Sequence, residues 1–155
     1  MKTKHILTFL LLIFISFGYS QKKELRNANK FYDSGEYLSA LDLLETSKSL
    51  FDSSDDKIKS QVMLLYGKIY TSTEDFELAI KSFNNSRELG ANENDLNSEI
   101  NKLETALITS AIADNESENF SDAAKKLKIV YDINPENNAL YLYYAASSAV
   151  NSNDL

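Results

Sequence analysis

The chain has no cysteine and no tryptophan, and only one proline, four glycines and one histidine among its 155 residues. The absence of cysteine excludes disulfides, thiol nucleophiles and lipid attachment through a cysteine. Because glycine and proline are so few, turn signals are sparse. The histidine, His5, lies in a segment that we expect to be removed. The mature chain would then lack a histidine general base and a zinc site of histidine or cysteine.

The start of the chain has the pattern of a secretory signal peptide. Lys2, Lys4 and His5 make a basic start, residues 6–17 are apolar or small, and small residues stand three and one positions before Gln21. This pattern predicts a signal peptide at 1–20 and a folded domain at 21–155. An uncleaved anchor is the alternative, but the apolar run is shorter than the roughly 20 residues of a spanning helix. No later stretch is apolar enough to cross a bilayer.

The charge is strongly acidic. The whole chain has 16 Lys and Arg against 23 Asp and Glu, a net charge of -7, and loss of two lysines with the signal peptide would take it to −9. Binding to nucleic acid or to an anionic membrane surface needs clustered cations, so neither is expected. The apolar fraction of 43% is normal for a globular protein.

Apolar residues recur at spacings of three and four, which predicts helices and an all-α fold. The expected helices cover residues 22–33, 37–50, 55–71, 75–89, 93–113, 120–133 and 135–150. Residues suited to helix ends support these boundaries. They are Ser53 or Ser54 as a cap, Asn92 or Asn94 as a cap, Gly90 as a left-handed terminator, and Asn134 as a cap with Pro135 at the first helical position.

One short pattern occurs three times: an aromatic residue, an alanine three positions later and a large apolar residue four positions after that. It reads Tyr37-x-x-Ala40-x-x-x-Leu44, Phe76-x-x-Ala79-x-x-x-Phe83 and Phe120-x-x-Ala123-x-x-x-Leu127. Where two helix backbones cross closely only a small side chain fits, and we expect the alanines there. The aromatic would fill the mouth of each hairpin, and the large apolar residue would contact the next hairpin. Such hairpins bury their apolar faces by stacking.

This pattern resembles the tetratricopeptide repeat, whose first helix carries a small residue followed three positions later by an aromatic one. The matching residues are Ala28 with Phe31, Gly67 with Tyr70, and Ala111 with Asp114, where the third pair departs from the family. Pro135 stands where the family closes a repeat. The resemblance implies a right-handed α-solenoid of antiparallel helix hairpins, with three repeats and the first helix of a fourth. A generic helical bundle is the alternative.

Two further departures from the family are visible. The family's turn glycine is present at Gly35 but is replaced by Glu74 and Glu118. The alanines are 39 residues apart from Ala40 to Ala79 and 44 apart from Ala79 to Ala123, against a period of about 34.

The resemblance also implies where partners bind, because first helices line a concave groove in that family. Carried over by position, the lining would be Leu25, Asn29, Tyr32, Asp33, Leu64, Lys68, Thr71, Ile108, Ile112, Asn115, Leu142 and Ala146. No cofactor and no metal are expected; the acidic stretch 52–56 lacks the glycine and the spaced glutamate of a calcium loop. No carboxylate pair is distinguished by a motif, so we expect no catalysis.

The last expected helix is unusually apolar over residues 139–146, which is typical of an association site. We therefore expect a chain that is a fragment of a longer array, with self-association through this Tyr-rich helix as the alternative. The leading hypothesis is a non-catalytic scaffold for other proteins, exported to the periplasm or the outer membrane of a Gram-negative bacterium. The alternative is the N-terminal sensor region of a larger membrane or envelope protein.

Overall fold

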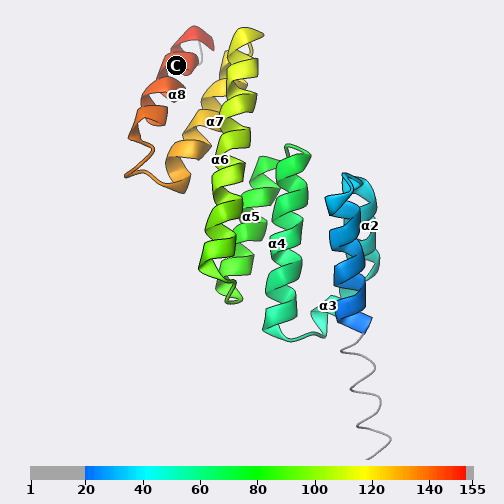
Figure 1. The fold of residues 1–155 in the computed structure, drawn as a ribbon. Coiled ribbons are helices and arrows are strands. Elements are labelled where there is room, and N and C mark those ends of the chain that lie inside the picture. The colour runs from blue at the N-terminus through cyan, green and yellow to red at the C-terminus, as the bar shows by residue number, and fades with distance from the viewer. Residues whose placement is uncertain (1–19, 153–155) are drawn as a thin grey trace, which may run out of the picture. The chain divides into compact units, whose positions relative to one another are not determined.

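The computed structural model describes residues 20–152, so residues 1–19 of the expected signal peptide lie outside the described residues. Throughout the described range the regular structure is helical, which confirms the all-α prediction (Figure 1). A helix that we call the N-terminal helix covers residues 20–33. The others are α2 Tyr37–Thr46, α3 Lys48–Asp52, α4 Asp56–Ser72, α5 Phe76–Glu88, α6 Glu93–Glu116, α7 Phe120–Ile133 and α8 Ala139–Ser152.

The single helix expected over residues 37–50 is wrong, because the chain breaks at Ser47 into α2 and α3. The Thr46 hydroxyl donates to the Asp42 carbonyl oxygen at 2.8 Å. The amide of Leu50 then bonds to the Ser47 carbonyl oxygen three positions back, at 3.0 Å. A bond over three residues tightens the turn that separates α2 from α3.

The helix cap expected at Ser53 or Ser54 is also wrong. Asp55 caps α4, and its Oδ1 accepts from the amide of Ile58 at 2.8 Å. The Ser54 hydroxyl instead donates to the Phe51 carbonyl oxygen at 2.6 Å and closes α3. The Asn92 cap is confirmed, since its Oδ1 accepts from the amides of residues 94 and 95 in the first turn of α6.

The start of α8 differs from the prediction of a cap at Asn134 and a first residue at Pro135. Residues 135–137 form a turn, and the helix begins at Ala139. The Asn138 side chain explains the delay: it is buried and donates to the Val130 carbonyl oxygen at 2.8 Å. This bond ties the turn to the end of α7 before the next helix starts.

Three turns within the expected hairpins share one backbone geometry, and the turn at Gly90 before α6 shares it too, with a φ of 84° and an amide bond of 3.0 Å from Ala91 to the Ser86 carbonyl oxygen. Each contains a residue with positive φ, and the residue after it sends its amide to the carbonyl oxygen five positions back, as in a Schellman motif. The φ angles are 77° at Gly35, 62° at Glu74 and 63° at Glu118. The matching amide bonds run from Glu36 to Phe31, from Asp75 to Tyr70 and from Asn119 to Asp114, at 2.9, 2.9 and 2.8 Å. Glu74 and Glu118 thus adopt the conformation for which glycine is favoured.

The three alanines of the sequence pattern occupy equivalent positions. Ala40, Ala79 and Ala123 are each the fourth residue of a helix and have no exposed surface. Their amides bond to the carbonyl oxygen of the residue just before the helix, at 3.0, 3.0 and 3.1 Å. Their burial in helices, which the sequence predicted, is confirmed.

The chain forms two compact units, which divide between Leu96 and Asn97. In the first unit, α4 and α5 pack against each other at Gly67. A Cβ atom added there would lie 2.3 Å from the Phe83 ring. Phe83 therefore packs against the first helix of its own hairpin, whereas the sequence predicted contact with the next one. Ser60 and Ser86 join the same two helices through exchanged hydroxyl–carbonyl bonds of 3.2 and 2.9 Å.

In the second unit, Ala111, Leu127 and Ala145 form a core against which Tyr141 packs. Polar contacts surround this core. Lys126 donates to Asp114 at 2.6 Å and to the Ser110 hydroxyl at 2.8 Å. An ion pair thus occupies the position where the tetratricopeptide pattern has an aromatic residue, which accounts for the departure at Asp114.

Candidate functional site

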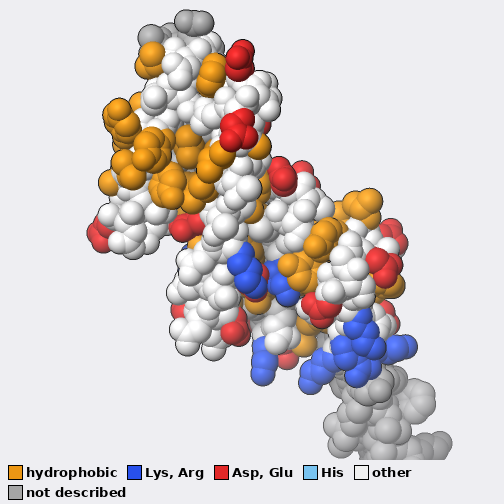
Figure 2. Space-filling view, turned by 45° about the horizontal axis from the view of Figure 1, so that its top comes forward, with side chains coloured by type: hydrophobic (Ala, Val, Ile, Leu, Met, Phe, Trp, Pro, Cys, Tyr) orange, Lys and Arg blue, Asp and Glu red, His pale blue; other side chains and the backbone are white. Residues whose placement is uncertain are grey.

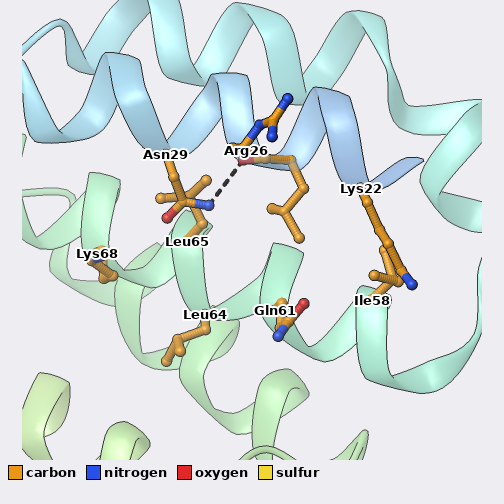
Figure 3. Close-up of a pocket in the computed structure, with 9 residues that line it drawn as sticks. Lys22, Arg26, Asn29, Ile58, Gln61, Leu64, Leu65 and Lys68 are labelled. Carbon is orange, nitrogen blue, oxygen red and sulfur yellow. Dashed lines mark hydrogen bonds between the residues drawn. The ribbon is translucent and has the colours of Figure 1, made fainter. Parts of the chain in front are cut away.

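An open groove of about 440 Å³ lies between the N-terminal helix and α4 in the first unit (Figure 3). It is lined by apolar, amide and cationic side chains at helical spacing from both elements. They are Lys22, Leu25, Arg26, Asn29, Ile58, Gln61, Leu64, Leu65 and Lys68. We call this the first groove.

The floor of the first groove belongs to the core. Leu25, Ile58 and Leu65 are 7%, 5% and 1% exposed. Because these side chains are packed on their inner sides, the floor is preformed rather than created by a ligand. Leu64 is half-buried and stands between the floor and solvent.

The polar side chains of the first groove lie around this floor. Figure 3 shows Lys22 and Lys68 toward its two ends, with Gln61 and Leu64 of α4 between them. Asn29 donates through Nδ2 to the Leu25 carbonyl oxygen at 2.9 Å, which fixes its amide against its own helix. No acidic residue lines the groove.

Lys68 is positioned by an aromatic contact. Its Nζ lies 4.3 Å from the centre of the Tyr32 ring, a cation–π distance. The Tyr32 ring lies 5.5 Å from the ring of Tyr37, the first residue of α2. The ammonium group is therefore held beside the groove by a small aromatic cluster.

A second groove of about 480 Å³ lies within the second unit. Its lining is more apolar than that of the first groove and holds no charged residue. The lining residues are Ile108, Ile112, Asn115, Phe120, Leu127, Tyr141, Tyr144, Ser147, Ser148 and Asn151. Ser148 donates to Asn115 Oδ1 at 2.9 Å, which joins α8 to α6 at this groove.

The structure brings together most of the residues that the sequence assigned to partner binding. Leu25, Asn29, Leu64 and Lys68 line the first groove, and Tyr32 adjoins it through Lys68. Ile108, Ile112 and Asn115 line the second. Asp33, Thr71, Leu142 and Ala146 line neither groove.

Leu142 is 41% exposed, and Tyr141 and Tyr144 take the place expected for it. Ala145 and Ser148 are the buried residues of α8. Residue 141 lies one turn before residue 145 and shares that buried face. Residue 142 is rotated about the helix axis by about 100° from residue 141. An error of one position in register therefore moves a side chain to another face.

Five lining residues of the first groove were missed from the sequence: Lys22, Arg26, Ile58, Gln61 and Leu65. A signal for three of them was present. Lys22 and Arg26 precede Leu25 and Asn29 by three positions, and Gln61 precedes Leu64 by three, so each lies on the face of a residue already assigned.

Among the described residues, the largest shift in pKa is that of Tyr66, which lies near Glu45. Burial, followed by a hydrogen bond of 2.8 Å from its hydroxyl to Glu45 Oε1, raises the pKa of Tyr66 far above its ordinary value. Burial also raises the pKa of Tyr70, whose ring is stacked 5.9 Å from that of Tyr66. Both hydroxyls stay protonated at neutral pH, so neither tyrosine supplies a base or a nucleophile there.

Other chemistry finds little support in the described residues. Between residues 20 and 152, no three or more Asp, Glu, His or Cys residues are grouped as a metal site would need. None of the helices in that range has the length and hydropathy of a membrane span.

Exposed apolar side chains are concentrated on α8. Leu140, Tyr143 and Val150 are 58%, 68% and 55% exposed. Figure 2 shows hydrophobic side chains gathered near the C-terminal end of the described chain.

Comparisons with protein families, with curated proteins and with solved structures found no match to this chain.

Proposed function

We propose that the chain is a non-catalytic scaffold that binds segments of other proteins in its grooves. The observation that carries the proposal is the first groove. Leu25, Asn29, Leu64 and Lys68, which the resemblance to the tetratricopeptide repeat assigns to the lining, border one open groove with a buried apolar floor. A preformed apolar floor edged by polar groups suits an extended or helical segment.

The tetratricopeptide-like solenoid is the arrangement that we propose for the fold. Three features support it. The turns at Gly35, Glu74 and Glu118 share one geometry, the three pattern alanines are buried at equivalent helix positions, and Gly67 admits the Phe83 ring at a close helix crossing. In a solenoid each hairpin covers the apolar face of its neighbour, which matches a chain without disulfides.

The location follows from the sequence. The basic start, the apolar stretch and the small residues before Gln21 favour export to the periplasm or to the outer membrane of a Gram-negative bacterium. Fusion of residues 1–20 to a reporter that is active only after export tests this part of the proposal. A reporter that stays cytoplasmic would contradict it.

The binding role is tested by capture of envelope proteins with the purified chain and with Leu64→Ala, which truncates a half-buried side chain of the first groove. The matched control is Leu38→Ala on α2, whose side chain is 76% exposed and lines no groove described above. We expect Leu64→Ala to lose partners that Leu38→Ala keeps. Identical partner sets for both variants and for the unaltered chain would contradict groove binding.

A second candidate is the sensor or interaction region of a larger envelope protein. The exposed Leu140, Tyr143 and Val150 on α8 favour it, because a face of this kind is commonly covered by a neighbouring element. The reading frame of the gene tests it. Continuation past Leu155 into a spanning segment would support this candidate, and a stop codon there would exclude it.

A further inference from the structure

The first groove differs in charge from the rest of the chain. Three of its lining residues, Lys22, Arg26 and Lys68, are cationic, whereas the whole chain carries a net charge of -7. None of the three forms an ion pair with another described residue. Cations without acidic partners around a recess concentrate positive potential there.

We propose that the first groove binds an acidic segment of a partner protein in extended conformation. Its two carboxylates would pair with Lys22 and Lys68, and an apolar side chain between them would contact Leu25 and Leu64. This inference rests on the proposed scaffold function and names the chemistry of its partner.

The spacing of the two lysines sets the spacing of the carboxylates. Lys22 and Tyr32 are ten positions apart on one helix, about 15 Å at 1.5 Å per residue, and Lys68 Nζ lies over the Tyr32 ring. An extended chain advances about 3.3 Å per residue. Acidic residues four positions apart, whose side chains share one face of an extended chain, therefore reach both cations, and the side chain midway between them points from that same face toward the buried floor of the groove.

The groove also offers hydrogen bonds to a peptide backbone. Gln61 is exposed on α4 between the two lysines (Figure 3). Its side-chain amide carries both a donor and an acceptor, which suits the alternating N–H and C=O groups of an extended chain. The charged, apolar and amide contacts of the groove thus all match the same kind of ligand.

A flat anionic surface fits the groove less well. Leu25, Ile58 and Leu65 are nearly buried, so a membrane surface would meet the cations and leave the apolar floor uncovered. A side chain from a peptide reaches the floor. The partner that uses both parts of the groove is therefore an acidic protein segment rather than a lipid surface.

The test is fluorescence anisotropy with the purified chain and a dye-labelled peptide, acetyl-Asp-Ser-Leu-Ser-Glu-amide. Both ends are blocked, so side chains supply the only carboxylates. We expect the acidic peptide to bind at least ten-fold more tightly than its Asn/Gln counterpart, and more weakly as salt screens the pairs. Lys22→Gln and Lys68→Gln should each weaken binding about three-fold, and the double variant about ten-fold. Lys23→Gln and Lys30→Gln, on exposed residues of the same helix outside the groove, should change nothing.

The outcomes separate this inference from the proposed function. Equal binding of both peptides, unaffected by the lysine variants but lost in Leu64→Ser, would overturn the charge inference and leave groove binding intact. Binding unaffected by Leu64→Ser as well would remove the groove from the proposed function. Failure of the acidic peptide to bind, or preferential binding to phosphatidylglycerol vesicles, would overturn the inference. Circular dichroism of each variant checks that it is folded.

Discussion

Replacing Glu118 by glycine is expected to stabilise the chain by about 1 kcal/mol, although Glu118 is an exposed turn residue. Its φ of 63° lies in the left-handed region, which costs a residue other than glycine about 1–2 kcal/mol. Glycine removes that cost. The greater freedom of glycine in the unfolded chain takes back about 0.4–1 kcal/mol. The net gain is therefore positive.

The carboxylate of Glu118 adds a smaller effect. It lies two residues beyond the end of α6, where the negative end of the helix dipole opposes an anion by a few tenths of a kcal/mol. Glu118→Gln removes this charge and keeps the strained backbone. It should therefore gain less than about 0.5 kcal/mol.

Gly35 provides the reverse substitution in the turn of equivalent geometry. Its φ is 77°, and a Cβ atom there would meet nothing within 4 Å. Gly35→Ala therefore introduces backbone strain without a side-chain clash, and it should cost about 1 kcal/mol.

Urea unfolding at 25 °C, followed by circular dichroism, measures all three variants against the unaltered chain. The expected order of unfolding free energies is Glu118→Gly highest and Gly35→Ala lowest, with similar dependence on urea. A Glu118→Gly variant no more stable than the original, beside an unchanged Gly35→Ala, would refute the reasoning from backbone strain. Equal gains from Glu118→Gly and Glu118→Gln would assign the effect to charge.

Three further predictions concern buried contacts. Gly67→Ala places a Cβ atom 2.3 Å from the Phe83 ring and should lower the unfolding free energy by about 1–2 kcal/mol, after the gain in helix propensity is counted. Urea unfolding should show that Phe83→Leu restores part of this loss in the double variant. Strictly additive losses from the two substitutions would contradict the contact. The raised pKa of Tyr66 means that its ionisation favours the unfolded chain. The unfolding free energy should therefore fall as pH rises past 10, and it should fall less in Tyr66→Phe. Urea unfolding of both chains at pH 8 and at pH 10.5 measures this fall, and an equal fall in the two chains would refute the reasoning. Asn138→Ala leaves a buried carbonyl oxygen without its donor and should cost about 1–3 kcal/mol, measured by thermal unfolding, whereas the exposed Asn137→Ala should be nearly neutral.

Much of the local structure was predictable because it depends on local spacing. The pattern of Phe120, Ala123 and Leu127 predicts a helix over 120–133, and α7 has those bounds. An alanine three positions after an aromatic residue was expected to be buried, and Ala40, Ala79 and Ala123 are. These features follow from helical period and side-chain size, which the sequence states directly.

Helix ends and turns were predicted less well, because several polar residues compete for the same backbone groups. Ser53, Ser54 and Asp55 are all suitable caps, and only the folded chain shows that Ser54 closes α3 while Asp55 opens α4. Similarly, Pro135 is suited to a first helical turn, but the side chain of Asn138 reaches the Val130 carbonyl oxygen eight positions back and delays α8.

The sequence by itself determined that the chain is helical, where its small crossing residues lie, and that its net charge is acidic, because period, size and charge are properties of the residues. Only the tertiary structure decided that Phe83 packs against Gly67, that Tyr141 rather than Leu142 lines the second groove, and that Lys22 and Lys68 edge one apolar floor. Such contacts join residues tens of positions apart. They depend on the rotation of each helix about its axis, which packing between helices decides.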